Sequence, residues 1–225
     1  MFSKKQQNKV IDRYTSKFNE FGYSQKTLGW DKGKQDIRFD ILTSLWDFEN
    51  KSVLDIGCGF GDLYQFLNNK FNNIKYYHGI DLVPALVYEG EKRYAHNENF
   101  SIETANFLEW EADRAYDFII ISGIFNFKLE NENTNYTFIK NILEKSFKIV
   151  DIGVSSNFLS NKVDYEYEHS FYADPAHILD FGYSLTRNLI LRNDYFPFEF
   201  TLSLDKRDKF IVKNTIFETY TSQYE

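Results

Sequence analysis

The sequence predicts an α/β fold: a seven-stranded, mostly parallel sheet with helices on both faces. An apolar, partly β-branched run at residues 53–56 leads through a glycine-rich turn into a helical pattern. Similar apolar runs then alternate with helical spacing along the chain. The 225 residues are enough for one domain, 1–225, with a helical lid at 1–50, a core at 51–205 and a tail at 206–225.

The glycine-rich turn is the first sign of a nucleotide site. Gly57, Gly59 and Gly61 alternate directly after the strand. Glycine can take a positive φ and lets a ligand approach the backbone without meeting a Cβ. Leu63 and Leu67 then begin a helical face. Strand, glycine turn and helix form the first half of a nucleotide-binding βαβ unit.

An acidic residue follows at the distance that a ribose-binding carboxylate needs. The next strand, residues 76–82, ends in Asp81, twenty residues after Gly61. A dinucleotide fingerprint would need a third glycine at position 62, where Asp62 would repel a pyrophosphate at the helix N-terminus. Asp55 should place a second carboxylate in the same pocket. Acid near the turn suits a ligand with an ammonium and a sulfonium better than one with two phosphates.

Residues 55–61 resemble motif I, D-x-G-x-G-x-G, of the class I S-adenosylmethionine-dependent methyltransferases. The resemblance implies a Rossmann-like core, S-adenosylmethionine as cofactor and S-adenosylhomocysteine as product. In these enzymes the junction after the third strand holds the adenine, and an Asn here still offers an acceptor oxygen. The cofactor contacts implied in the core are Asp55, Gly57, Cys58, Gly59, Asp81, Leu82, Asn106 and Phe107.

Two helical patterns precede the core. Val10, Tyr14 and Lys17 have helical spacing, and residues 37–45 form a second apolar helical face. The segment between them, 22–33, reads as a loop because it is rich in glycine. We expect this region to lie over the cofactor and the acceptor.

Three residues of this lid are expected to point toward the cofactor: Tyr14, Trp30 and Arg38. Ordinary packing is the alternative for the two aromatic residues. Arg38 lies on a largely apolar helix face, and a buried arginine needs an anionic partner. The cofactor carboxylate and Asp55 are the candidates for that partner.

The later elements continue the alternation. Pro84 suits the first turn of a helix, and Asp174 suits an N-cap. The last two strands fit the antiparallel pair that closes class I methyltransferase sheets. We expect helices at 84–95, 137–147 and 175–181, and strands at 100–104, 116–122, 149–154, 188–192 and 198–204.

The ends of two strands supply candidate contacts with the methyl group and the acceptor, because ligands of open α/β sheets bind beyond the carboxyl ends of the strands. Ser122 and Gly123 end the most apolar strand and should pass close to the reactive methyl. Phe125 and Asn126 follow them, and Asn157 follows the fifth strand. The N/D-P-P-Y/F motif of DNA and glutamine amino-methyltransferases is absent from this position.

A polar, aromatic insertion at 158–174 should lie on the acceptor side. His169 is the candidate general base, because its ordinary pKa lies near neutrality; a surface-loop histidine is the alternative. Tyr172 is a candidate wall of the pocket. An acceptor with an ionised phosphoryl oxygen would need no base, and His169 would then orient it. Such an acceptor would also need cations, for which Lys17, Lys26, Arg38 and Arg192 are available.

Three further stretches resemble one group of bacterial class I methyltransferases: GYSQKTLGWDKGKQDIRFDIL, SGIFNF and DPAHILDFGYSLTRNLILRNDYFPFEFTLSL. Some members resemble enzymes of surface-polysaccharide pathways, including one that decorates capsule sugars with O-methyl phosphoramidate. This resemblance implies O-methylation of a small molecule in capsule or surface-polysaccharide biosynthesis. The alternatives are N-methylation of a small amine, a non-catalytic S-adenosylmethionine sensor and a dehydrogenase, which Asp62 disfavours.

Composition excludes several other classes. The net charge of −7 and the lack of a dense Lys/Arg cluster argue against a nucleic-acid partner. No segment approaches eighteen consecutive apolar residues, so we expect a cytoplasmic protein with no membrane contact. Cys58 is the single cysteine, which leaves no internal disulfide or cysteine-based zinc site. No three acids have metal-site spacing, so no metal is expected, and the oligomeric state stays open.

Overall fold

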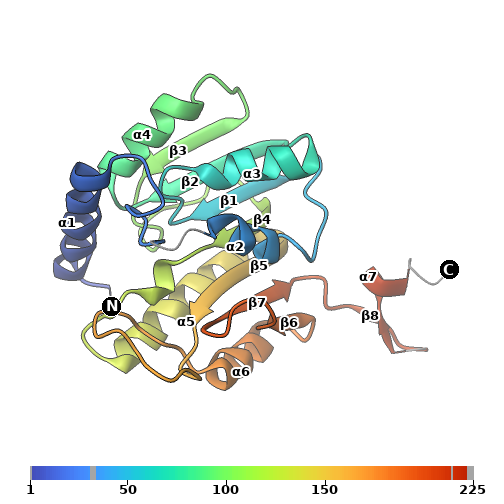
Figure 1. Ribbon diagram of the computed structural model, residues 1–225. Helices are drawn as coiled ribbons and strands as arrows, with labels where there is room; N and C mark the ends of the chain where they lie inside the picture. The colour runs from blue at the N-terminus through green and yellow to red at the C-terminus, as the bar shows by residue number, and fades with distance from the viewer. Residues whose placement is uncertain (1, 31–33, 214, 222–225) are drawn as a thin grey trace.

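The computed structural model describes residues 2–30, 34–213 and 215–221. It contains one seven-stranded sheet with the order β3-β2-β1-β4-β5-β7-β6 (Figure 1). The strands are β1 (Ser52–Ile56), β2 (Tyr76–Asp81), β3 (Phe100–Thr104), β4 (Tyr116–Ile121), β5 (Val150–Leu159), β6 (Leu189–Arg192) and β7 (Glu199–Asp205). The helices are α1 (Lys4–Phe21), α2 (Gln35–Leu42), α3 (Asp62–Phe71), α4 (Pro84–Tyr94), α5 (Glu132–Ile149) and α6 (Pro175–Leu185), with a 3₁₀ turn, η1 (Ile124–Asn126).

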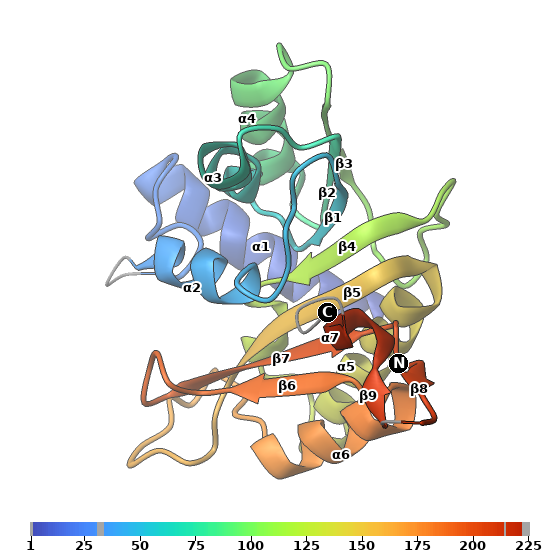
Figure 2. The same cartoon turned by 90° about the vertical axis from the view of Figure 1, so that its right-hand side faces the viewer.

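The predicted Rossmann-like sheet is confirmed, including its closing strands. β1 to β5 run parallel, and β7 lies antiparallel between β5 and β6 (Figure 2). β1 lies between β2 and β4, so the strand order reverses there. Such a reversal opens a crevice beyond the carboxyl ends of the strands, which is where ligands of open α/β sheets bind.

Helices cover both faces of the sheet because the central strands are apolar on both sides. Val53 and Ile120 pack with α2 and α3 on one face. Leu54, Ile119 and Ile121 point the other way and pack with α5 and α6. Side chains that alternate between faces while staying apolar are typical of parallel strands buried on both sides.

Three elements are longer than the sequence indicated: α5, β5 and also α6, which runs to Leu185 where a helix at 175–181 was expected. α5 begins at Glu132 because the Asn131 side chain accepts a hydrogen bond from the Thr134 N–H and caps the helix. β5 continues to Leu159 because it pairs with β7 along its length, as far as Glu199. The polar insertion therefore begins after Leu159 and returns at Asp174, the predicted N-cap of α6.

The N-terminal helix lies over the glycine turn. A capping box between Ser3 and Gln6 starts α1, and the helix packs beside α4. Tyr14 and Phe18 pack against a small apolar cluster that includes Phe60. In Figure 1, α1 lies on the side toward which the parallel strands point. The chain thus places its first helix over the carboxyl ends of the strands.

The tail forms a two-stranded ribbon, β8 (Phe210–Ile211) and β9 (Ile216–Phe217), and a last turn, α7 (Glu218–Thr221). These elements lie on the opposite side of the molecule from α1 (Figure 1). Residues 31–33 of the predicted loop and 222–225 of the predicted tail lie outside the described residues. No helix in the described part of the chain combines the length and apolar character needed to cross a membrane.

Candidate functional site

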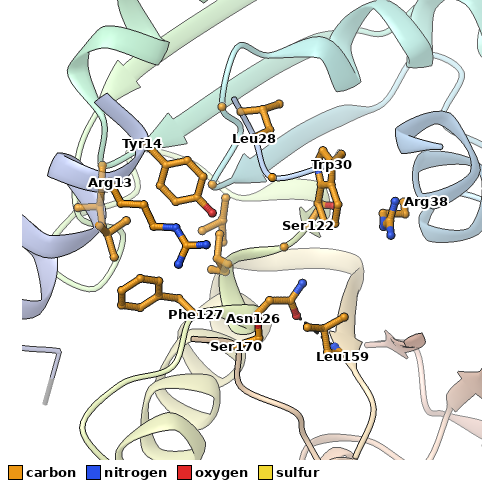
Figure 3. Close-up of a pocket in the computed structure, with 18 of the residues that line it drawn as sticks. Arg13, Tyr14, Leu28, Trp30, Arg38, Ser122, Asn126, Phe127, Leu159 and Ser170 are labelled. Carbon is orange, nitrogen blue, oxygen red and sulfur yellow. Dashed lines mark hydrogen bonds between the residues drawn. The ribbon is translucent and has the colours of Figure 1, made fainter. Parts of the chain in front are cut away.

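One large cavity lies at the carboxyl ends of the central strands (Figure 3). Its volume is about 1140 Å³, and sites for one small ligand usually measure about 300–1,000 Å³. Residues of α1, the glycine turn and the ends of β1, β2 and β4 line one part of it, and the 160–172 loop lines another. The cavity has room for two small molecules side by side.

The glycine turn has a backbone that only glycine fits well. Gly57 has a φ of +76°, and its N–H donates to the Ile80 carbonyl at 2.7 Å, which ties the turn to β2. A Cβ at Gly57 would lie 2.0 Å from Cγ2 of Ile124. Any side chain there would push the turn into η1, so the turn holds its backbone next to the cavity without a side chain in the way.

Asp81 lies beside this turn at the end of β2. Its Oδ2 accepts from the Gly59 N–H at 2.9 Å, and its Oδ1 accepts from the Val83 N–H at 2.9 Å. Burial raises the pKa of Asp81, and hydrogen bonds from the neighbouring backbone, chiefly from Val83 and Gly59, oppose that rise. A carboxylate offers about four lone-pair sites, so each oxygen keeps one for a ligand. This arrangement fits the two hydroxyls of a ribose.

Asp55 lies at the end of β1 and is 3% exposed. Its Oδ2 accepts from the Tyr77 hydroxyl at 2.6 Å, while its Oδ1 accepts no hydrogen bond from a described residue. Burial raises the pKa of Asp55 to about 7, against a hydrogen bond from Tyr77 that lowers it. A buried acid without a cation, facing a cavity, fits a positively charged ligand.

This raised pKa predicts that cofactor affinity depends on pH. Below pH 7 the Asp55 carboxyl of the free protein is largely neutral, and a bound ammonium favours the carboxylate, so binding releases a proton. We expect the affinity for S-adenosylmethionine to rise about tenfold between pH 6 and pH 8 and then to level off. Calorimetry in two buffers of different ionisation enthalpy would count the released proton. Asp55→Asn should abolish this release, and an unchanged release would contradict the assignment.

The raised pKa of Asp55 has the opposite effect on the pH dependence of folding stability. The folded state holds the Asp55 proton up to about pH 7, whereas the unfolded chain releases it near the ordinary value of 3.8. The contribution of Asp55 to the stability of the free protein therefore falls as pH rises between these values.

Asp62 lies elsewhere. It does not line the main cavity but a second one of about 450 Å³, together with Tyr23. Its Oδ1 accepts from the Tyr23 hydroxyl at 2.7 Å and from the Tyr94 hydroxyl at 3.1 Å. The expectation that the acid at position 62 faces the cofactor pocket is therefore wrong: Asp62 fastens the segment after α1 to the start of α3.

At the end of β3, Asn106 lines the cavity beside the buried Phe107. The Asn106 Oδ1 accepts from the Leu108 N–H at 3.1 Å, which leaves one lone-pair site free. Phe107 and Trp110 stack with ring centroids 6.1 Å apart. Asn106, Phe107 and Leu82 form the part of the cavity wall where the predicted adenine contacts lie.

Arg38 finds a partner that the sequence did not suggest. Its Nε lies 3.0 and 2.9 Å from the two carboxylate oxygens of Glu199 on β7, and its side chain is 6% exposed. Apart from Glu199, no described carboxylate pairs with Arg38, and Asp55 does not either. Burial raises the pKa of Glu199, and Arg38 opposes that rise. Asp55, one of the two candidate partners, is not the partner of Arg38, because α2 packs over β7.

Hydrogen bonds extend from this ion pair toward the cavity. The Glu199 Oε1 accepts from Asn157 Nδ2 at 2.8 Å, and the Asn157 Oδ1 accepts from the Gly123 N–H at 2.9 Å. Trp30 lies over the Arg38 guanidinium at 4.0 Å, and a Cβ at Gly123 would come within 2.9 Å of the Trp30 ring. Arg38, Glu199 and Asn157 thus hold the turn at the end of β4 against Trp30.

The structure brings most of the predicted site together. All thirteen candidate cofactor residues line the cavity, including Tyr14, Trp30, Ser122 and Gly123. Burial raises the pKa of Tyr14 and, more strongly, that of Cys58, so both groups stay neutral near pH 7. Four candidate acceptor or catalytic residues also line it: Lys17, Asn126, His169 and Tyr172.

Three acceptor candidates are wrong. Phe125 is 1% exposed and stacks on Phe158 in the core, with ring centroids 5.0 Å apart. Asn157 is 1% exposed, and its amide group is hydrogen-bonded to Gly123 and Glu199. Arg192 lies outside the cavity lining and pairs with Asp194 at 2.6 Å. Phe125 lies in η1, Asn157 lies within β5 and Arg192 ends β6. Each is in contact with neighbouring residues instead of the cavity.

Sequence reasoning missed Arg13, which precedes Tyr14 on α1 and lines the cavity (Figure 3). Its guanidinium lies 5.7 Å from the centroid of the Phe127 ring. The helical spacing that picked out Tyr14 and Lys17 would have found Arg13 if charged residues on the same face had been considered.

The cavity can bind two reactants, orient them and exclude water from them. The cofactor supplies an electrophilic methyl group when bound. Ser122 and Gly123 follow β4 and line the cavity, and His169 and Tyr172 line it from the 160–172 loop. Holding two reactants in line can contribute about 7–11 kcal/mol to the lowering of a barrier. Among the described residues no group of three His, Cys, Asp or Glu is placed to hold a metal ion; the expectation of a metal-free reaction stays a prediction.

The family model and one relative are named as methyltransferases, and a second relative is named as a methylphosphate capping enzyme. A family model described as a methyltransferase domain matches residues 53–145. A Mycobacterium tuberculosis protein named as a methyltransferase, Rv1506c, is 29% identical over 159 residues, covering 69% of this chain and 93% of its own. The U6 snRNA methylphosphate capping enzyme Amus of Drosophila melanogaster is 33% identical over 94 residues, covering 41% of this chain and 30% of its own.

Solved structures share the fold at low sequence identity. Magnesium protoporphyrin IX methyltransferase from Synechocystis PCC 6803 superposes with a TM-score of 0.64 at 13% identity, covering 89% of this chain and 95% of its own. The N-methyltransferase NodS from Bradyrhizobium japonicum gives 0.63 at 14% identity, covering 86% and 97%. The sequence matches and the shared fold agree with the geometry of the glycine turn and Asp81, and they identify the chain as an S-adenosylmethionine-dependent methyltransferase with the class I fold.

Proposed function

We propose that this methyltransferase acts on a small molecule that binds beside the cofactor in the same cavity. The observation that carries the proposal is the continuity of one cavity from the glycine turn to the 160–172 loop. The turn end holds Asp81 and Asp55, and the loop end holds His169 and Tyr172. A volume of about 1140 Å³ suits a cofactor and a compact acceptor better than a polymer.

In this proposal the cofactor lies along the strand ends. Asp81 accepts the ribose hydroxyls, Asp55 faces the ammonium, and Asn106 with Phe107 holds the adenine. Tyr14 and Trp30 cover the cofactor from the helical lid of residues 1–50. Arg38 then supports Trp30 and the turn at Gly123. Glu199 occupies one side of the Arg38 guanidinium, so that side does not bind the cofactor carboxylate.

The favoured reaction is O-methylation in capsule or surface-polysaccharide biosynthesis, with a hydroxyl or a phosphoryl oxygen, such as that of a phosphoramidate, as acceptor. Two facts support it: the resemblance of three stretches to that bacterial group, and the relative whose name describes a methylphosphate cap. Asp164 and Glu168 also line the cavity and favour a second candidate, N-methylation of a small amine.

The test is calorimetric titration with S-adenosylmethionine and S-adenosylhomocysteine, followed by turnover assays with phosphoramidate, sugar-phosphate and amine acceptors. Micromolar binding and formation of S-adenosylhomocysteine with one acceptor class would support the proposal. Binding without turnover of any acceptor would favour a sensor instead. Tight binding of NAD in place of S-adenosylmethionine would contradict the proposal.

His169→Ala tests the role of the loop. We expect turnover with a neutral hydroxyl acceptor to fall by about 10²–10⁴-fold, with no change in affinity for S-adenosylhomocysteine. With an ionised phosphoryl acceptor the fall should be smaller, because no proton has to be removed. His96→Ala, on an exposed turn outside the cavity, is the matched control. Unchanged turnover in His169→Ala would make His169 an ordinary loop residue.

A further inference from the structure

Two cations on α1 face the cavity without a carboxylate. Arg13 and Lys17 lie one helical turn apart, and both line the cavity. In the described part of the chain no carboxylate forms an ion pair with either. Arg13 lies over the Phe127 ring at 5.7 Å, and the Lys17 Nζ donates only to the Lys26 carbonyl, at 3.4 Å. Both charges are therefore available to a ligand.

The other cations of the cavity are already engaged. Arg38 is paired with Glu199, and Lys162 lies 2.9 Å from Asp174. The positive charge left in the cavity is therefore concentrated on one face of α1. For a chain with a net charge of −7, this local surplus is opposite in sign to the molecule as a whole.

An amide side chain adds a further polar donor to the same cavity. The Asn126 Oδ1 accepts from the Leu159 N–H at 3.1 Å, so the amide is oriented with its N–H₂ group turned away from β5. Asn126 lines the cavity, and in Figure 3 the Arg13 guanidinium reaches in from α1 at the left while the Asn126 amide lies farther to the right. The guanidinium and the ammonium are donors only, and the Asn126 amide adds an N–H₂ donor.

We propose that Arg13 and Lys17, with Asn126, bind a phosphoryl group carried by the methyl acceptor. Guanidinium groups bind such oxygens through two parallel N–H bonds. The acids Asp164 and Glu168 line the cavity from the exposed 160–172 loop and repel an anion, so the phosphoryl group binds against α1 and Phe127. The inference rests on the proposed function only in that the cofactor occupies the glycine-turn end.

The experiment titrates inorganic phosphate and methyl phosphate into the full chain, both free and saturated with S-adenosylhomocysteine, at constant ionic strength set with chloride. Arg13→Gln is compared with Lys9→Gln, which removes one charge from an exposed position of α1 outside the cavity. We expect Arg13→Gln to weaken phosphate binding about tenfold or more and Lys9→Gln to change it less than twofold. Both variants should bind S-adenosylhomocysteine like the parent.

Three outcomes would overturn the proposal: no phosphate binding to the parent, equal phosphate binding in Arg13→Gln, or a tenfold loss of S-adenosylhomocysteine affinity in Arg13→Gln. The last would assign Arg13 to the cofactor carboxylate. If the parent failed to bind S-adenosylhomocysteine at all, the proposed function would fall, while the titrations of the free protein would still decide the role of Arg13.

Discussion

Replacing Asp81 with alanine is expected to weaken binding of both S-adenosylmethionine and S-adenosylhomocysteine by about 100-fold or more. The carboxylate has one acceptor site left on each oxygen, because Gly59 and Val83 use the others. Two hydrogen bonds to a charged acceptor contribute about 1.5–3 kcal/mol each, and their joint loss corresponds to that change in affinity. Calorimetric titration of the two ligands measures it directly.

Two further variants separate this effect from a general one. Asp81→Asn keeps an acceptor oxygen for part of the site and should give an intermediate loss. Asp113→Ala removes an exposed acid paired with Arg114, and it should bind both ligands like the parent. If Asp81→Ala bound S-adenosylhomocysteine as tightly as Asp113→Ala does, the assignment of the whole glycine-turn end would be wrong.

The second large effect is expected at Glu199. Glu199→Ala leaves Arg38 buried without its carboxylate and removes the acceptor of the Asn157 amide. Breaking a buried ion pair by removing one partner typically costs about 3–5 kcal/mol. We expect the free energy of unfolding in urea to fall by this amount, and turnover to fall as well, because the Gly123 turn loses its support.

A double variant distinguishes positioning from mere stability. Arg38→Met with Glu199→Met replaces the pair by apolar side chains of similar volume, which is often neutral for stability or stabilising. The double variant should therefore unfold close to the parent midpoint. Its kcat should remain low, because Asn157 still lacks the acceptor that fixes its amide against Gly123. Full recovery of both stability and kcat would show that the network only holds the fold together.

The fold could be predicted because its signals are local. The apolar run before Gly57 and the helical face after it fix a strand, a turn and a helix within about twenty residues. Asp81 could be assigned because its distance from the turn along the chain reflects one βαβ crossover. The boundaries of α5 and β5 were less accurate, because a single cap at Asn131 and a distant partner strand decide them.

Long-range contacts could not be predicted in the same way. Arg38 and Glu199 are 161 positions apart in sequence, and their pairing depends on α2 packing over an antiparallel strand inserted late in the chain. Asn157 was a candidate acceptor contact because it was expected to follow the fifth strand, yet it lies within β5 and is hydrogen-bonded to Gly123 and Glu199. Arg192 was a candidate cation for a phosphoryl acceptor, but it forms an ion pair with its exposed neighbour Asp194.

The sequence by itself determined the cofactor end of the cavity, since the glycine turn and Asp81 need only short-range geometry to come together. Only the tertiary structure decided the acceptor end. There α1, η1 and the 160–172 loop, which are far apart along the chain, meet across one cavity. Which charges remain available there depends on which partners have already paired, and such pairing is a property of packed side chains rather than of spacing along the chain.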